Sequence, residues 1–125
     1  MRKVFAQELR QNYLINDKNS ILLGDISVGL FLDDQDELVP NAYNMGILEQ
    51  SMISFAAGLS TESDNVFVHT ISPFIVERAY EQIKLESNQL YCLHILTIRS
   101  RMICIVVEVS LLVVVVVVEI VVEVY

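Results

Sequence analysis

The stretch Asn44–Leu59, with the sequence NMGILEQSMISFAAGL, decides how the rest of the chain is interpreted. Leu48, Met52, Phe55 and Leu59 follow one another at intervals of four, three and four residues. This is the spacing of a single buried helix face. The stretch therefore predicts an amphipathic helix.

Glu49 lies in the first turn of this expected helix, in a row that is otherwise apolar. Free backbone N–H groups and the helix dipole favour a negative group there, which lowers the cost of removing a carboxylate from water. Gly46 precedes the helix and lets another molecule approach the backbone. Glu49 is thus a candidate for acid–base chemistry, and the alternative is a first-turn glutamate satisfied by backbone amides or water.

Length and composition set the outer limits. A chain of 125 residues with 54% hydrophobic residues makes one domain with a real core. The net charge of −8 argues against nucleic acid or an anionic membrane surface as the main partner. The two cysteines, Cys92 and Cys104, have no metal-like spacing, and the N-terminus is too polar for a secretory signal. The expected location is the reducing cytoplasm.

Short apolar runs alternate with helical periodicities along roughly the first 90 residues. Such alternation predicts an α/β fold, a three-layer sandwich with a mainly parallel sheet. The expected elements are a helix over Val4–Asn16, a strand over Ile21–Leu23, an extended segment over Pro40–Asn44, the helix of Glu49, a strand over Val66–Val68 that ends at His69, and a helix that starts at Pro73.

Three polar positions each have a functional and a structural interpretation. Asp25 follows a strand, where open α/β sheets gather their ligands, but it can equally turn the chain. His69 has no partner spaced to orient it as a base, which favours a hydrogen-bonded structural histidine. The acidic run Asp33–Glu37 lacks the ligand pattern of an EF-hand and is interpreted as a solvated loop.

The sequence motif in the central stretch resembles that of a known family. Gly46-Ile47-x-Glu49-Gln50 followed by Ala56-Ala57-Gly58-Leu59 is similar to the pyrimidine-binding domain of transketolase-like, thiamine diphosphate-dependent enzymes, including deoxyxylulose-phosphate synthases. Further matching blocks extend the resemblance over roughly residues 3 to 90, namely Leu23–Ile26, Val66–Thr70, Phe74 and Arg78–Ile83.

The resemblance implies roles for individual residues. It makes Glu49 the catalytic acid that hydrogen-bonds N1′ of the cofactor's aminopyrimidine ring. It places Phe74 against that ring and adds Ile47, Ile71 and Asp25 to the cofactor-binding set. The sequence departs from the family at Ile71, where a further aromatic residue is usual, and at Asn41, where an arginine is frequent.

Half of the expected site lies elsewhere. In the resembling family a separate domain with a Gly-Asp-Gly motif holds the diphosphate and its Mg²⁺, and Gly24-Asp25-Ile26 is not that motif. The chain is therefore expected to act with a diphosphate-binding subunit or a second transketolase-like chain. The reaction implied is ketol transfer or carboligation on phosphorylated sugars or α-keto acids. The alternative is a degenerate pyrimidine domain that serves as a non-catalytic interaction module.

Beyond about residue 90 the composition shifts to mostly β-branched and aliphatic residues, so residues 91–125 are treated as a separate Val-rich tail. Val113–Val118 is unbroken valine. Three interpretations stay open: a membrane span, in which a central Glu108 or Glu119 would each cost about 2.5 to 3.5 kcal/mol; one or two buried strands; or a truncated or frameshifted segment that does not continue the domain.

Overall fold

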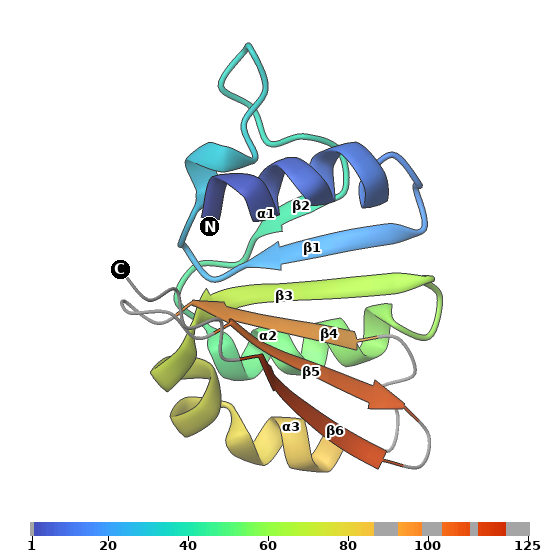
Figure 1. Ribbon diagram of the computed structural model, residues 1–125, viewed down its shortest axis with the longest axis vertical. Helices are drawn as coiled ribbons and strands as arrows, with labels where there is room; N and C mark the ends of the chain where they lie inside the picture. The colour runs from blue at the N-terminus through green and yellow to red at the C-terminus, as the bar shows by residue number, and fades with distance from the viewer. Residues whose placement is uncertain (1, 87–92, 99–103, 111–112, 120–125) are drawn as a thin grey trace.

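The computed structural model describes the backbone of residues 2–86, 93–98, 104–110 and 113–119, and the side chains of residues 3–86 (Figure 1). Within these ranges the chain forms a six-stranded sheet in the order β2-β1-β3-β4-β5-β6. The strands are β1 (Asn19–Leu23), β2 (Ala42–Asn44), β3 (Asn65–Ile71), β4 (Leu93–Ile98), β5 (Cys104–Ser110) and β6 (Val113–Glu119).

The sheet is parallel in its first part and antiparallel in its second. Strands β2, β1, β3 and β4 are paired in parallel, whereas β5 pairs with β4 and with β6 in antiparallel fashion. In Figure 1 the arrowheads of β1 to β4 all point to the same edge of the sheet. The register sets Leu23 level with Asn44 on one side and with His69 on the other. The prediction of an α/β fold with parallel strands is confirmed.

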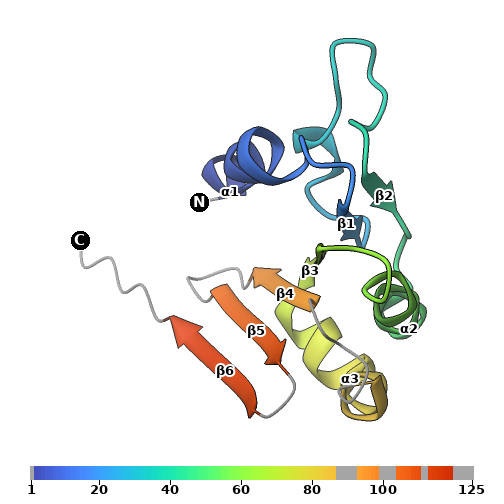
Figure 2. The same cartoon turned by 90° about the vertical axis from the view of Figure 1, so that its right-hand side faces the viewer.

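The expected helices form, with adjusted ends. They are α1 (Arg2–Glu8), which continues as a π-helical segment η1 (Leu9–Tyr13), α2 (Glu49–Leu59), and a π-helical segment η3 (Phe74–Arg78), which leads into α3 (Tyr80–Glu86). A short 3₁₀ turn, η2 (Val28–Leu30), follows β1. Figure 2 shows α1 on one side of the sheet and α2 and α3 on the other.

Two hydrophobic clusters follow from the alternation of side chains along β1 and β3. Leu22 and Val68 belong to the cluster under α2, with Met52 and Ile75. The neighbours on the same strands turn the other way, to α1, where the second cluster consists of Ala6, Leu9, Leu14, Ile21, Leu23, Phe31, Ala42 and Phe67. Both strands are buried on both faces, as their continuous apolar runs indicate.

The predicted buried face of α2 is partly wrong. Met52 is buried, but Leu48 and Phe55 are 57% and 51% exposed. The helix is turned by about one residue, so that the row of Glu49, Met52, Ile53, Ala56 and Ala57 faces the sheet. The two alanines in this row let the helix approach the strands closely, which favours it over the row with Phe55.

Strand β3 is longer than predicted. It continues through His69 and Thr70 to Ile71, because the β-branched Thr70 and Ile71 suit an extended backbone. Successive side chains therefore point to opposite faces, and Thr70 reaches the side of α2. This difference places a polar side chain next to Glu49.

The acidic run Asp33–Glu37 is an exposed loop, as predicted. The Asp33 side chain accepts hydrogen bonds from the backbone N–H groups of Gln35 and Glu37. The loop projects from the rest of the domain (Figure 1). Among residues with described side chains, no three His, Cys, Asp or Glu residues gather as a metal site would need.

The tail segments with a described backbone are β-strands. Leu93–Ile98 pairs with β3 in parallel, and Cys104–Ser110 pairs with Val113–Glu119 in antiparallel fashion. No helix in the described ranges is both long enough and apolar enough to cross a membrane. The expected domain boundary near residue 90, Cys92 and the last residues of the tail lie outside the described residues.

Candidate functional site

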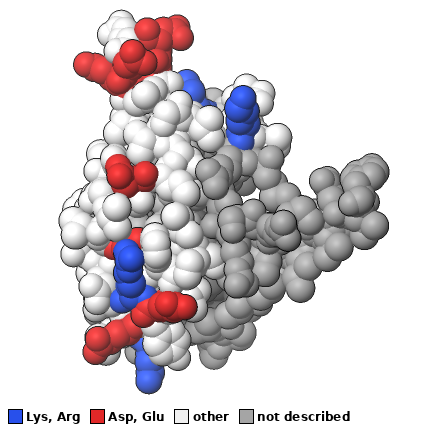
Figure 3. All heavy atoms as spheres, turned by 90° about the vertical axis from the view of Figure 1, so that its left-hand side faces the viewer, with Lys and Arg blue, Asp and Glu red and all other residues white. Residues whose placement is uncertain are grey.

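The carboxyl ends of β1, β2 and β3 lie at one edge of the sheet, and candidate site residues follow each of them in a loop or at the start of a helical segment. Asp25 follows β1, Ile47 and Glu49 follow β2, and Phe74 follows β3. Such an edge is where open α/β sheets bind ligands. Figure 3 looks onto this edge and shows acidic and basic side chains side by side in its lower part, while most of the described surface is uncharged.

Glu49 is the most deeply buried acid of this edge. It is the first residue of α2 and is 3% exposed. Thr70 Oγ1 donates to its Oε1 over 3.4 Å, and Arg78 Nη1 donates to its Oε2 over 3.3 Å. Both distances are long for hydrogen bonds to a carboxylate, so neither partner holds Glu49 tightly. The prediction of a carboxyl group in the buried row of the helix is confirmed.

Arg78 joins Glu49 to Phe74. Its guanidinium carbon lies 3.8 Å from the centroid of the Phe74 ring, so that the cation covers the face of the ring. The Arg78 side chain is 47% exposed, whereas the Glu49 side chain is 2% exposed. The ion pair therefore has one fixed, dry member and one member that reaches solvent.

Gly24 allows β1 to approach Thr70 closely. A Cβ atom at position 24 would lie 2.8 Å from Thr70 Oγ1 and 2.9 Å from Thr70 Cβ. Side chains do not approach one another so closely, so any larger residue would push Thr70 away. Gly24 therefore keeps Thr70 in the position from which its hydroxyl group reaches Glu49.

Asn44 connects the loops after β1 and β2. Its Oδ1 accepts hydrogen bonds from the backbone N–H groups of Asp25 and Gly46, and its Nδ2 donates to Asp25 Oδ1 over 3.1 Å. Asp25 and Gly46 both have positive φ, 59° and 72°. This conformation is easy for glycine and tolerated by aspartate. Asp25 is exposed, and its carboxylate lies at the rim of the edge.

The apolar residues expected to bind the cofactor are partly exposed to solvent. Ile71 ends β3 and is half-buried, as is Phe74, but Ile47 is 61% exposed. A buried carboxyl group, an aromatic face and branched aliphatic side chains fit an aminopyrimidine ring.

His69 lies on the opposite face of the sheet from Thr70. It is fully buried, its Nε2 lies 3.1 Å from Ser27 Oγ, and its ring centroid lies 5.2 Å from that of Phe5. Ser27, in the loop after β1, has a positive φ of 60°. These contacts agree with the interpretation of a hydrogen-bonded structural histidine.

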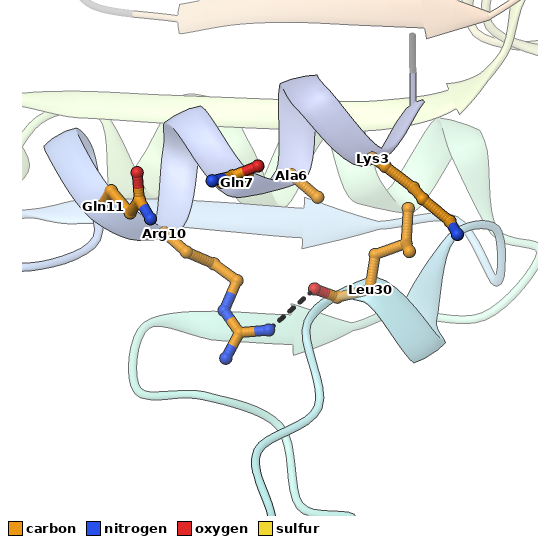
Figure 4. Close-up of a pocket in the computed structure, with 6 residues that line it drawn as sticks. All are labelled: Lys3, Ala6, Gln7, Arg10, Gln11 and Leu30. Carbon is orange, nitrogen blue, oxygen red and sulfur yellow. Dashed lines mark hydrogen bonds between the residues drawn. The ribbon is translucent and has the colours of Figure 1, made fainter.

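A hollow of about 480 Å³ lies beside α1 (Figure 4). Lys3 and Arg10 extend from the helix toward η2, where Arg10 Nη1 donates to the Leu30 carbonyl oxygen over 3.1 Å. The other lining residues are Ala6, Gln7 and Gln11. Because α1 and α2 cover opposite faces of the sheet, this hollow is separate from the Glu49 site.

The structure brings together only part of the predicted set. Glu49 and Phe74 meet through Arg78, while Asp25 is held by Asn44 in the neighbouring loop. Sequence reasoning did not identify Thr70 and Arg78 as site residues. The spacing of four between Phe74 and Arg78 on one helical segment is a signal that could have found the second contact.

No protein-family model matches the chain. The chain is similar to a protein from Rhodococcoides fascians that is described as an uncharacterized 33.6 kDa protein in the fasciation locus, with 38% identity over 73 residues. The match covers 55% of this chain and 22% of that protein. The chain thus spans less than a quarter of this relative's length.

Proposed function

We propose that this chain is the pyrimidine-binding half of a thiamine diphosphate-dependent, transketolase-like enzyme of the cytoplasm. The observation that carries the proposal is the burial of Glu49 at the first turn of α2, beside Thr70 and at the ligand-binding edge of parallel strands. The proposal includes a three-layer arrangement, which the hydrophobic clusters on both faces of β1 and β3 support.

Each residue has a defined task in this proposal. Glu49 holds a proton at N1′ of the aminopyrimidine ring as a general acid–base group. Phe74 stacks on the ring, and Ile71 with Ile47 excludes water from it. Thiamine diphosphate, when bound, supplies the carbon nucleophile for ketol transfer or carboligation.

The proposal requires a second subunit. Among the residues with described side chains, no group of acidic, His or Cys ligands could hold Mg²⁺ for the diphosphate. A diphosphate-binding subunit, or a second transketolase-like chain, supplies that part of the site and covers the exposed Ile47. The proposed substrates are phosphorylated sugars or α-keto acids.

The test is activity of the reconstituted pair. The full chain is combined with a subunit that carries the Gly-Asp-Gly motif, and ketol transfer is measured with thiamine diphosphate and Mg²⁺. Glu49→Gln keeps the shape of the side chain but removes its ability to ionise. We expect turnover to fall about 10² to 10⁴-fold, the usual contribution of a general acid–base group.

The matched control is Glu62→Gln, which makes the same chemical change at an exposed position just after α2. Its turnover should stay at the level of the unmodified chain. Full turnover of Glu49→Gln in a folded pair would reject the assignment of Glu49.

The alternative is a non-catalytic interaction module. The ion pair between Glu49 and Arg78 favours it, since the carboxylate already has a partner within the chain. Calorimetric titration of the reconstituted pair with thiamine diphosphate separates the two proposals. An interaction module still pairs with the partner subunit. Its titration with thiamine diphosphate gives no binding heat that is lost in Glu49→Gln.

A further inference from the structure

We propose that Arg78 is an internal competitor that occupies the aminopyrimidine position and sets the affinity for the cofactor. This inference rests on the proposed function, since it assigns Glu49 and Phe74 to the aminopyrimidine. It adds that the guanidinium group must leave before the ring can bind.

The geometry supports a direct overlap. A guanidinium is a planar cation with N–H donors along its edge. Arg78 places its guanidinium carbon 3.8 Å from the Phe74 ring centroid and directs Nη1 to Glu49 Oε2 over 3.3 Å. An N1′-protonated aminopyrimidine is also flat and cationic, and it would use the same ring face and the same carboxylate. The two groups cannot occupy this position together.

Arg78 is suited to leave the site. Its side chain is 47% exposed, so the guanidinium can move to water without breaking a buried core. Glu49, in contrast, is fixed in the row of α2 that faces the sheet.

The competitor also has a function in the empty chain. A buried carboxylate without a partner is strongly unfavourable, and Arg78 supplies the missing positive charge until the cofactor does so. The apparent dissociation constant then equals the intrinsic constant divided by the fraction of chains in which the site is open. If Arg78 closes the site in about nine chains of ten, its removal tightens binding about tenfold.

The test uses the full chain and a probe that needs no diphosphate site. The probe is 4-amino-5-hydroxymethyl-2-methylpyrimidine, the ring half of thiamine, and its dissociation constant is measured by NMR titration of backbone amides. We expect Arg78→Ala to lower this constant about three- to tenfold. Arg78→Lys keeps the charge but loses the planar group and should give an intermediate value. Arg10→Ala removes an arginine from the opposite face of the sheet and should leave the constant unchanged.

The same titrations distinguish failure of the inference from failure of the proposed function. If Glu49→Gln weakens probe binding but Arg78→Ala leaves it unchanged or also weakens it, the competitor role of Arg78 is overturned and the proposed function is retained. If the probe binds equally well to Glu49→Gln, or binds to no folded variant, both the proposed function and the competitor role of Arg78 are overturned. A circular dichroism spectrum of each variant confirms that it is folded.

Discussion

At one edge of the sheet, each face has a buried polar side chain, and the partners of these two side chains differ in charge and exposure. On the side of α1, His69 is fully enclosed and its hydrogen-bond partner, Ser27, is neutral and comes from a neighbouring loop. On the side of α2, Glu49 is equally dry but its ionic partner, Arg78, is about half exposed. His69 and Thr70 are adjacent in sequence, so one step along β3 separates the two environments.

The difference indicates which face can exchange partners. Replacing the contacts of His69 would require opening the cluster under α1, which includes Phe31 and Leu23. Replacing Arg78 at Glu49 requires only the rotation of an exposed side chain. We therefore interpret the α1 face of this edge as structural support and the α2 face as the place where a ligand binds.

The largest expected effect is on the α1 face. His69→Ala should lower the free energy of unfolding by about 2 to 4 kcal/mol, because it leaves a cavity beside Phe5 and removes the partner of Ser27. Urea denaturation of the full chain measures the change. Phe55→Ala removes an aromatic side chain that is half exposed and should cost less than about 1 kcal/mol. Equal costs at the two positions would contradict the comparison.

Gly24→Ala should lower the free energy of unfolding by about 1 to 3 kcal/mol, because its new methyl group would displace Thr70. The control is Gly29→Ala, where an added Cβ meets nothing within 4 Å. Denaturation of both variants gives the difference. A Gly24→Ala variant as stable as Gly29→Ala would show that β1 and Thr70 can separate without cost.

Two of the four parallel strands, β1 and β3, were predictable from sequence because each carries a short apolar run bounded by glycine or polar turns, whereas β4 (Leu93–Ile98) was not predicted. The run at Ile21–Leu23 gave the first strand, and Val66–Val68 gave the second. Their ends were less predictable. The strand was predicted to end at His69, yet β3 continues through Thr70, because His69 pairs with Leu23 of β1 and both residues pair with β4.

The candidate site was predictable at Glu49 but not around it. Periodicity placed the carboxyl group in the apolar row, since Met52, Ile53 and Ala56 repeat at helical spacing. It could not choose between this row and the row with Phe55, because both are largely apolar and only packing against the strands decides. Arg78 was missed as a partner because 28 residues separate it from Glu49, and only the pairing of the strands brings them together.

A smaller effect is expected for Thr70→Val, which keeps the shape of the side chain but removes its hydroxyl group. The hydrogen bond from Thr70 Oγ1 to Glu49 is 3.4 Å long, so its loss should cost about 0.5 to 1.5 kcal/mol. The measurement is denaturation of Thr70→Val and of Thr61→Val, whose hydroxyl group is exposed and bonds to the Gly58 carbonyl. A cost at Thr61 that exceeds the cost at Thr70 would argue that Thr70 does not support the carboxyl group.

The smallest expected effect has the opposite sign. Gly58 lies near the end of α2, is exposed, and has open space where a Cβ would stand. Gly58→Ala should therefore raise the free energy of unfolding by about 0.4 to 1 kcal/mol, because alanine restricts the unfolded chain without a clash in the folded one. The change is the same single methyl group as in Gly24→Ala. If the free energy of unfolding falls in Gly24→Ala and rises in Gly58→Ala, the close packing lies at Thr70. A loss of stability in both variants would show that the outer surface of α2 is also closely packed.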